Sequence, residues 1–327
     1  MNKLFLLIAV LALMGVLSAA FLQNNIFQNN ILKKDMASKP TLPVNKDRLY
    51  ADVEFLTSLT PARNAFNLPS LDKSAEYIQQ EFRKLSSRVS YQTFRVGQKE
   101  YKNIICTLGP DDGERIVVGA HYDVCGDQPG ADDNASGVAG LLEIARLVNE
   151  LKPELRYRID FVAFALEEPP YFKTDEMGSA VHAKSLSEAG VKLRGMVCLE
   201  MIGYYSEQKN SQQYPVAALK AIYPDKGNFI SVVGNMGQGH LVKHLKKYMQ
   251  AGSQIGVESL TAPASVPGVD FSDHLNYWRY DYPAVMITNT AFFRNPHYHL
   301  ESDTIDTLDF DKMAEVVKGV YWAVIHL

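Results

Sequence analysis

The 327-residue sequence predicts a three-layer α/β sandwich, in which helices cover both faces of a mixed, mostly parallel central sheet. Three observations lead to this prediction. Short apolar runs alternate along the chain with amphipathic helical stretches. Several of the apolar runs have no polar face, as expected of strands buried inside a sheet. The composition is that of an ordinary globular protein, with 46% hydrophobic and 21% charged residues.

Seven segments have the length and apolar content of strands, and the first two are expected to form an antiparallel hairpin at one edge. These segments are Val89–Val96, Asn103–Leu108, Ile116–Ala120, Ile159–Leu166, Met196–Leu199, Phe229–Val233 and Ala284–Thr288. Three stretches carry apolar residues at the spacing of one helical face. These are Ser74–Leu85, Ser136–Leu151 and a last helix that begins near Phe310.

The N-terminus is expected to direct export. Leu4–Leu22 carries no charge, follows Lys3 and is long enough to span a bilayer, so residues 1–22 are interpreted as a signal peptide or signal-anchor. Residues 23–46 are rich in Asn, Gln, Lys and Pro and are interpreted as a linker. The folded domain, residues 47–327, would then be periplasmic or extracellular, with a membrane tether if the apolar segment remains uncleaved.

Charge and cysteine content narrow the function further. Thirty-three basic and 37 acidic residues leave a net charge of -4, which argues against a nucleic-acid partner. Cys106, Cys125 and Cys198 are too few and too scattered for a disulfide scaffold or a cysteine-type zinc site. One disulfide with a free thiol, or three buried thiols, both remain open. For Cys125, four residues after His121, packing or a disulfide is favoured over metal binding.

Potential metal ligands follow four of the expected strands. In open α/β sheets functional groups collect just past the carboxyl ends of the strands, so these residues are expected to share one pocket. They are His121 and Asp123, then Glu167 and Glu168, then Glu200, and finally His297 and His299. A fifth group of potential ligands, the acidic segment Gly130–Asn134, lies at the entrance of the helix Ser136–Leu151.

The donor types point to a pair of zinc ions. Imidazole and carboxylate ligands suit zinc at a catalytic site, and the set exceeds the three protein ligands of a single ion. Two ions need a shared carboxylate, and Asp132 is expected to bridge them from its glycine-containing turn, with Asp133 left as its rival or as a helix cap. Adjacent strand residues point oppositely, so of Glu167 and Glu168 one would bind metal and the other would take a proton from metal-bound water.

Five pieces of sequence, read in order, resemble the dizinc aminopeptidase family. They are HYD with PGADDNASGVAGLLEIAR, FALEEPPYF with MGSAVHA, LEMIGYY, FSDH and HYHLESDT. The family includes bacterial leucyl-type aminopeptidases, glutamate carboxypeptidases and glutaminyl cyclases, and the resemblance runs from about Tyr101 to Leu308. It implies a zinc aminopeptidase-like fold, two Zn²⁺ per chain and a metal-dependent exopeptidase, most simply an aminopeptidase that cleaves the N-terminal bond of a peptide substrate.

The resemblance also implies a role for each matched residue. His121 and Glu200 would bind the first zinc and Glu168 and His299 the second, with Asp132 between the two ions and a cis peptide bond to Asp133. Glu167 would be the general base, and Asp123 would hydrogen-bond the far ring nitrogen of His121. At one of these positions the sequence differs from the family, and at another a choice between two histidines is needed. Glu200 stands where many members have Asp, and His299 is favoured over His297 because Asp303 and Thr304 complete the family's H-x-x-x-D-T pattern.

The substrate side is less well defined by the sequence. Ser272-Asp273-His274 resembles the family's S-D-H loop, which makes His274 a candidate helper for the reaction intermediate. Tyr204 and neighbouring loop aromatics are candidates for a side-chain pocket. Arg294 is the nearby cation that would bind a substrate carboxylate. A carboxypeptidase or dipeptidase, a single-zinc glutaminyl cyclase and a non-catalytic binding module therefore remain as alternatives, and the oligomeric state stays open.

Overall fold

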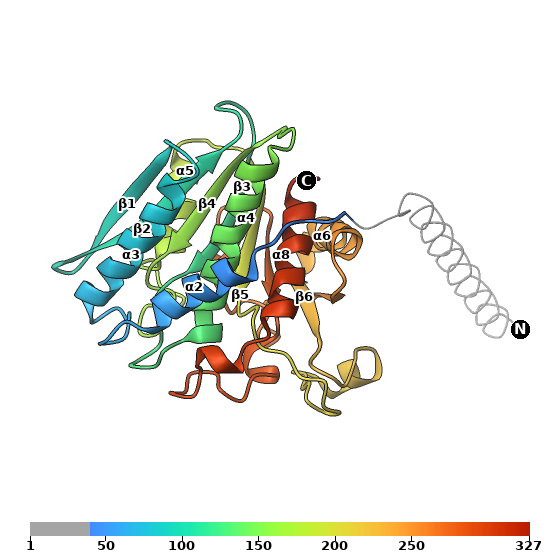
Figure 1. Ribbon diagram of the computed structural model, residues 1–327. Helices are drawn as coiled ribbons and strands as arrows, with labels where there is room; N and C mark the ends of the chain where they lie inside the picture. Colours follow the sequence, from blue (N-terminus) through green and yellow to red (C-terminus); the bar gives the residue numbers. More distant parts are fainter. Residues whose placement is uncertain (1–39) are drawn as a thin grey trace, which may run out of the picture. The chain divides into compact units, whose positions relative to one another are not determined.

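The computed structural model describes residues 40–327, and the chain from Leu42 to Leu327 forms one unit (Figure 1). The expected signal segment, residues 1–22, and the greater part of the expected linker lie outside the described residues. Within residues 40–327, none of the helices has both the length and the apolar character needed to cross a bilayer.

Eight strands form a single mixed sheet in the order β1-β2-β4-β3-β5-β8-β6-β7. The strands are β1 (Val89–Val96), β2 (Lys99–Leu108), β3 (Arg115–His121), β4 (Arg158–Phe164), β5 (Leu193–Glu200), β6 (Phe229–Gly234), β7 (Gly256–Thr261) and β8 (Ala284–Thr288). Strands β4, β3, β5 and β8 run parallel at the centre. Antiparallel pairs join β1 to β2, β2 to β4 and β6 to β8. The predicted mixed sheet and its antiparallel edge hairpin are confirmed.

Helices cover both faces of this sheet, which confirms the predicted three layers. One face carries α2 (Lys46–Thr57), α3 (Leu68–Arg83), α4 (Gly137–Leu151), α6 (Gly239–Gly252) and α8 (Phe310–Val324). The other carries α5 (Gly178–Glu188) and α7 (His274–Trp278). Strand residues alternate between the two cores, since Ile116 and Val118 pack in the larger one and Val117 in the smaller. Figure 1 shows α2, α3 and α4 lying across the sheet.

Differences from the expected elements have local causes. Strands β1 and β8 have the predicted bounds, but β4 ends at Phe164 instead of Leu166 because the chain turns at Leu166, where φ is +63°. Edge strand β7 was not predicted, since its sequence GVESLT is only partly buried and lacks an apolar run. Helix α2 was not predicted either; it begins at Lys46, where the Asn45 side chain accepts a hydrogen bond from the Arg48 backbone N–H.

A buried ion-pair network ties α2, α3 and α4 together. The Arg146 guanidinium lies 2.5 Å from Asp52 Oδ2 and 2.9 Å from Glu81 Oε2. Tyr77 donates its hydroxyl to the same Asp52 carboxylate at 2.6 Å. Asp52 is 1% exposed and Arg146 is 5% exposed, so neither charge has water as an alternative partner.

Replacing Arg146 with methionine is therefore expected to lower the free energy of unfolding by about 3–5 kcal/mol, because the Asp52 carboxylate would stay buried without its partner. Urea denaturation followed by circular dichroism measures the loss. The matched control is Lys184→Met, which removes a cation paired with Glu188 on the exposed surface of α5. Equal urea midpoints for R146M and the wild type would contradict the prediction, and K184M should leave the midpoint unchanged.

Candidate active site

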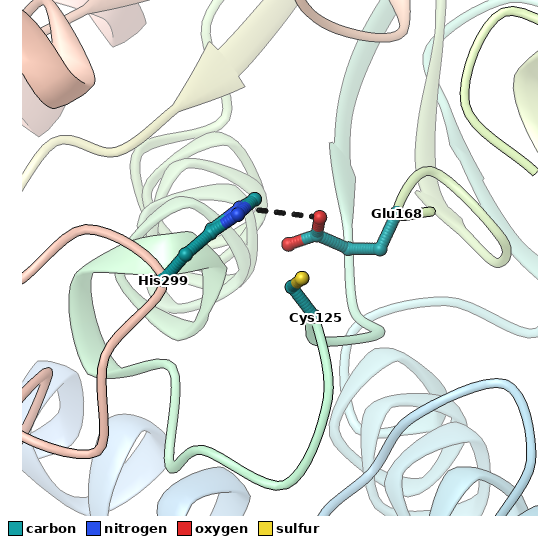
Figure 2. A group of neighbouring side chains, drawn as sticks. All are labelled: Cys125, Glu168 and His299. Atoms are coloured by element: carbon teal, nitrogen blue, oxygen red, sulfur yellow. Dashed lines mark ion pairs between the residues drawn. The ribbon is translucent and has the colours of Figure 1, made fainter. Parts of the chain in front are cut away.

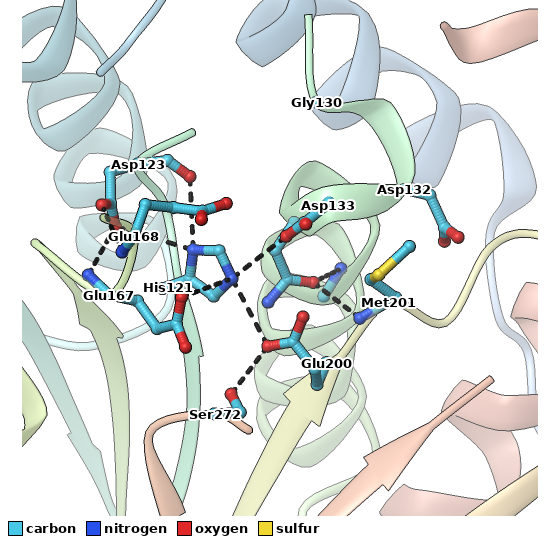
Figure 3. Close-up of polar contacts among 12 residues, drawn as sticks. His121, Asp123, Gly130, Asp132, Asp133, Glu167, Glu168, Glu200, Met201 and Ser272 are labelled. Atoms are coloured by element: carbon cyan, nitrogen blue, oxygen red, sulfur yellow. Dashed lines mark hydrogen bonds and ion pairs between the residues drawn. The ribbon is translucent and has the colours of Figure 1, made fainter. Parts of the chain in front are cut away.

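The residues predicted to carry the chemistry meet at the carboxyl edge of the parallel strands (Figure 3). His121 is the last residue of β3 and Glu200 is the last residue of β5. Glu167 and Glu168 follow β4 by a short turn, and His299 lies in the segment between β8 and α8. Because β3, β4 and β5 are parallel neighbours, their ends bring these side chains together.

One carboxylate, that of Asp133, lies between the two histidines. Its Oδ1 is 3.3 Å from His121 Nε2, and its Oδ2 is 3.2 Å from His299 Nε2. Each imidazole also faces a carboxylate of its own. Glu200 Oε2 is 3.4 Å from His121 Nε2, and Glu168 Oε2 is 3.3 Å from His299 Nε2. The cluster thus has two halves, each with one histidine and one glutamate, joined by Asp133.

The prediction that Asp132 lies between the histidines is wrong. Figure 3 shows its carboxylate directed away from His121. That carboxylate accepts five hydrogen bonds, from the backbone N–H groups of Gly203 and Tyr204, the amides of Asn289 and Asn295, and the Ser136 hydroxyl. The cis peptide bond in this segment joins Asp133 to Asn134, one position later than expected. A shift of one residue therefore exchanges the roles of two neighbouring carboxylates, and Asp132 becomes an internal support for the loops around the site.

Two further buried carboxylates hold the backbone of the residues that face the site. Asp123 accepts the N–H of Glu167 on Oδ1 and the N–H of Glu168 on Oδ2, both at 3.1 Å. Asp303 does the same for the pair Asp132 and Asp133, at 2.9 and 3.0 Å. We define these two carboxylates as the backbone clamps. Each of them fixes two consecutive residues through main-chain atoms.

Asp123 also contacts the histidine ring, as predicted, but at hydrogen-bond distance through its main-chain carbonyl oxygen and not through its carboxylate. His121 Nδ1 lies 3.2 Å from the Asp123 carbonyl oxygen and 3.6 Å from Oδ1. A partner on Nδ1 orients the ring and leaves Nε2 for the cluster. His297 and His299 were the two candidates for a place in the cluster. His299 faces Asp133, whereas the Nδ1 of His297 pairs with Ser302 on the exposed side of the loop.

The extra methylene of Glu200 is accommodated by a serine that sequence reasoning did not assign. Ser272 donates its hydroxyl to Glu200 Oε2 at 2.7 Å, and the Cys198 sulfur lies 3.1 Å from the same hydroxyl. Ser272 and Cys198 are both fully buried. The hydrogen bond holds the longer side chain at the distance from His121 given above. The S-D-H pattern was the signal that singled out this loop, but it did not indicate which residue would make the contact.

Glu167 lies on the His121 side of the cluster, with Oε2 3.9 Å from His121 Nε2 and 7% of the residue exposed. Burial raises the pKa of Glu167 well above its usual value, and the charges of Glu168 and Glu200 add to the effect against the opposing influence of His121. Burial likewise raises the pKa of Glu168 to about 7, with a contribution from Asp133. Concentrated negative charge of this kind is relieved by a bound cation.

The donor atoms of the cluster fit a metal ion. Buried polar atoms normally have hydrogen-bond partners, yet His121 Nε2, Asp133 Oδ1 and Glu168 Oε1 have none among residues 40–327. One donor atom from each of these three residues lies within 4.8 Å of the others. Unpaired imidazole nitrogen and carboxylate oxygen that converge in a buried site form a donor set suited to zinc.

Two of the three residues predicted to contact substrate have other partners. The His274 ring is buried, with Nε2 2.8 Å from the Val269 carbonyl oxygen and its edge against Trp278, because it begins α7 and turns inward. The Arg294 guanidinium is also buried; Nε donates to Gln212 and Nη1 to the Phe229 carbonyl. Both side chains are therefore engaged within the protein, and a role of His274 at an intermediate or of Arg294 at a substrate carboxylate stays a prediction.

Tyr204 contributes to the region mainly through its main chain. Its N–H donates to Asp132 and its carbonyl oxygen accepts from Asn289. The ring is partly exposed and lies edge-on to His297, with 5.8 Å between ring centroids. A direct contact between Tyr204 and substrate remains a prediction.

An apolar pocket adjoins the Glu200 side of the cluster. Phe271, Phe292 and Phe293 line it together with Val269 and Met286, and Glu200 is the one charged residue among its lining residues, all of which belong to the described part of the chain. Loop aromatics were expected to form such a pocket from the sequence; Phe292 and Phe293 line it, whereas Tyr204 does not. This pocket can receive a hydrophobic group directly beside the cluster of ligands.

The chain was compared with models of protein families and with known proteins, and the matches include a peptidase family and a leucine aminopeptidase. Residues 103–324 match the family model described as Peptidase family M28. The uncharacterized protein YfbL of Escherichia coli K12 is 48% identical over 86% of this chain and 88% of its own. The probable leucine aminopeptidase 1 of Trichophyton verrucosum is 25% identical over 92% of this chain and 79% of its own.

Solved structures share the fold. The LapA aminopeptidase of Legionella pneumophila aligns with a TM-score of 0.67 at 23% identity, over 86% of this chain and 69% of that one. A glutaminyl cyclase of Fimbriiglobus ruber aligns with a TM-score of 0.66 at 21% identity, over 89% and 98%. Two of the three groups of relatives named from the sequence, aminopeptidases and glutaminyl cyclases, are therefore found. The shared fold alone does not choose between their reactions.

Proposed function

The chain belongs to peptidase family M28, and from this premise we propose that it is a zinc-dependent exopeptidase, specifically an aminopeptidase that releases the N-terminal residue of a peptide. The observation that carries the proposal is the Asp133 carboxylate, which faces a histidine with each of its oxygens. A carboxylate shared in this way between two imidazoles is the arrangement expected of a bridging ligand in a two-metal hydrolase.

In this proposal each half of the cluster holds one ion. His121 and Glu200 would bind the first zinc, Glu168 and His299 the second, and Asp133 would give one oxygen to each. When bound, such a pair of ions lowers the pKa of a water molecule and polarises the scissile carbonyl group. Asp132, which was expected to be the bridging ligand, supports the surrounding loops instead.

Glu167 is proposed as the general base. Its carboxylate lies near the first half of the cluster but makes no ion pair with His299, so it is free to handle a proton. It would accept a proton from the attacking water at a carboxylate oxygen and return that proton to the leaving amine. The backbone clamp of Asp123 keeps Glu167 in position through its main-chain N–H, which leaves the side chain available.

The apolar pocket supports an N-terminal residue with a hydrophobic side chain. The side chain would enter among Phe271, Phe292 and Phe293, while nearby carboxylates attract the free α-amino group. A carboxypeptidase would need a cation for the substrate carboxylate, and Arg294 is buried and engaged elsewhere. The relative named a leucine aminopeptidase is consistent with this preference.

The proposal is tested by removing and restoring the metal. We expect the purified chain to hold two zinc ions by atomic emission and to hydrolyse leucine p-nitroanilide. A chelator should abolish hydrolysis because it removes the metal ions from both halves of the cluster, and added zinc should restore hydrolysis. N-acetyl-leucine p-nitroanilide, which lacks the free amine, is the matched control and should remain uncleaved.

The alternatives give different results in the same assay. Release of the C-terminal residue from N-blocked dipeptides, with no action on the free-amine anilide, would replace the proposal with a carboxypeptidase. Cyclisation of N-terminal glutamine with one zinc per chain would replace it with a glutaminyl cyclase. Full activity in the presence of a chelator that has removed the metal would reject metal dependence altogether.

A further inference from the structure

Cys125 lies at the second half of the cluster, although the sequence favoured packing or a disulfide for it. All three cysteines are free thiols. Cys106 and Cys198 are buried, whereas Cys125 is partly exposed in the loop that follows β3. A metal-binding donor atom from each of Cys125, Glu168 and His299 lies within 4.8 Å of the other two. Figure 2 shows the Cys125 sulfur beside the Glu168 carboxylate, close to the gap between Glu168 and His299.

A second observation, on the Glu168 carboxylate, indicates a cation site beside the Cys125 thiol. Glu168 is 3% exposed, and its Oε1 has no hydrogen-bond partner within the part of the chain that the structure describes. Its other oxygen, Oε2, faces His299 at 3.3 Å. In Figure 2 one carboxylate oxygen is joined to the histidine and the other is turned towards the Cys125 sulfur. An unpaired, buried carboxylate oxygen between a thiol and an imidazole is the arrangement expected where three donors converge on one cation.

We propose that the Cys125 thiolate is a ligand of the zinc ion held by Glu168 and His299. The inference rests on the proposed function, because it requires a metal in that half of the cluster. The sulfur–metal bond forms as the thiol releases its proton to solvent. With one oxygen from Asp133, the half would have four protein donors of three kinds, N, O and S.

The two halves of the site would then differ in kind. Four protein donors complete the tetrahedral shell typical of a closed zinc site, while His121, Glu200 and Asp133 supply three donors and leave a position open in the other half. The open half is where water and substrate would bind. A thiolate ligand also favours zinc, cobalt or cadmium over harder ions such as manganese in the closed half.

Cobalt substitution tests the inference by a signal separate from activity. The 327-residue chain is freed of any bound metal and titrated with Co²⁺, and its absorption spectrum is recorded. A thiolate-to-cobalt charge-transfer band is expected in the near ultraviolet for one of the two bound equivalents. The band should be absent in Cys125→Ser and unchanged in Cys106→Ala, which removes a core thiol from β2.

Alkylation provides a measurement that does not depend on a variant. Iodoacetamide followed by mass spectrometry should modify Cys125 quickly in the metal-free protein and slowly in the zinc-loaded protein. Two bound Co²⁺ ions without the band, or equal alkylation rates with and without zinc, would overturn the inference and leave the proposed function intact. Failure of the chain to bind any Co²⁺ would overturn both.

Discussion

Replacing Glu167 with glutamine is expected to lower kcat by about 10²–10⁴-fold while both metal ions remain bound. Glutamine has nearly the same shape, but its amide cannot accept the proton of the attacking water. The main-chain N–H of residue 167 would still donate to Asp123, so the loop should keep its place. Steady-state kinetics with saturating leucine p-nitroanilide measure kcat, and atomic emission on the same sample measures zinc.

Glu168→Gln is the matched control, since it makes the same chemical change one residue along the chain. The Glu168 carboxylate faces His299 at 3.3 Å, so this variant should lose metal together with activity. The two variants therefore separate proton transfer from metal binding. Wild-type turnover in E167Q, or loss of zinc from it, would show that Glu167 is not the base.

The second large effect concerns the adjacent carboxylates Asp132 and Asp133. Asp133→Asn is expected to leave the chain without tightly bound zinc and without activity, because one residue supplies an oxygen to each half of the cluster. Asp132→Asn should keep both ions with an affinity weaker by about 10–100-fold, the usual cost of removing a group that orients ligands indirectly. Zinc content after dialysis against graded chelator concentrations gives both affinities.

The comparison of these two variants decides which carboxylate bridges. Retention of zinc by D133N together with its loss from D132N would reverse the assignment. Both variants keep side-chain size, so a change in urea midpoint identifies any effect that comes from unfolding. We expect such a change in D132N, because its new amide cannot accept the five hydrogen bonds that the carboxylate receives.

Most of the scaffold was predictable because it follows from the hydrophobic pattern. The central strands are apolar on both sides, and two of them, β3 and β5, end at the polar residues His121 and Glu200. Parallel strands bring their carboxyl ends to one edge, so residues distant in sequence could be assigned to one site. This reasoning brought His121, Glu168 and Glu200 to one site, and the family pattern added His299 in preference to His297. Their binding of metal remains a prediction.

The remaining details depend on backbone angles that a hydrophobic pattern does not encode. Asp132 and Asp133 are chemically identical neighbours, and only the local path of the chain decides which one faces the histidines. Glu167 and Glu168 were treated as strand residues, but Leu166, with φ at +63°, places both in a turn. Cys125 was judged by its distance along the chain from His121, whereas its relevant neighbour in space is Glu168.

The backbone clamps have a consequence for how this scaffold changes over time. The carboxylates of Asp123 and Asp303 accept hydrogen bonds from main-chain N–H groups, which every residue except proline possesses. Of the positions they hold, Glu167, Glu168 and Asp133 can therefore change side chain by mutation while these main-chain hydrogen bonds persist, whereas the Asp132 side chain itself supports the loops. Such a framework lets new reactions arise from substitutions at a handful of sites, and the occurrence of peptide hydrolysis and glutamine cyclisation on one architecture is what that freedom would produce.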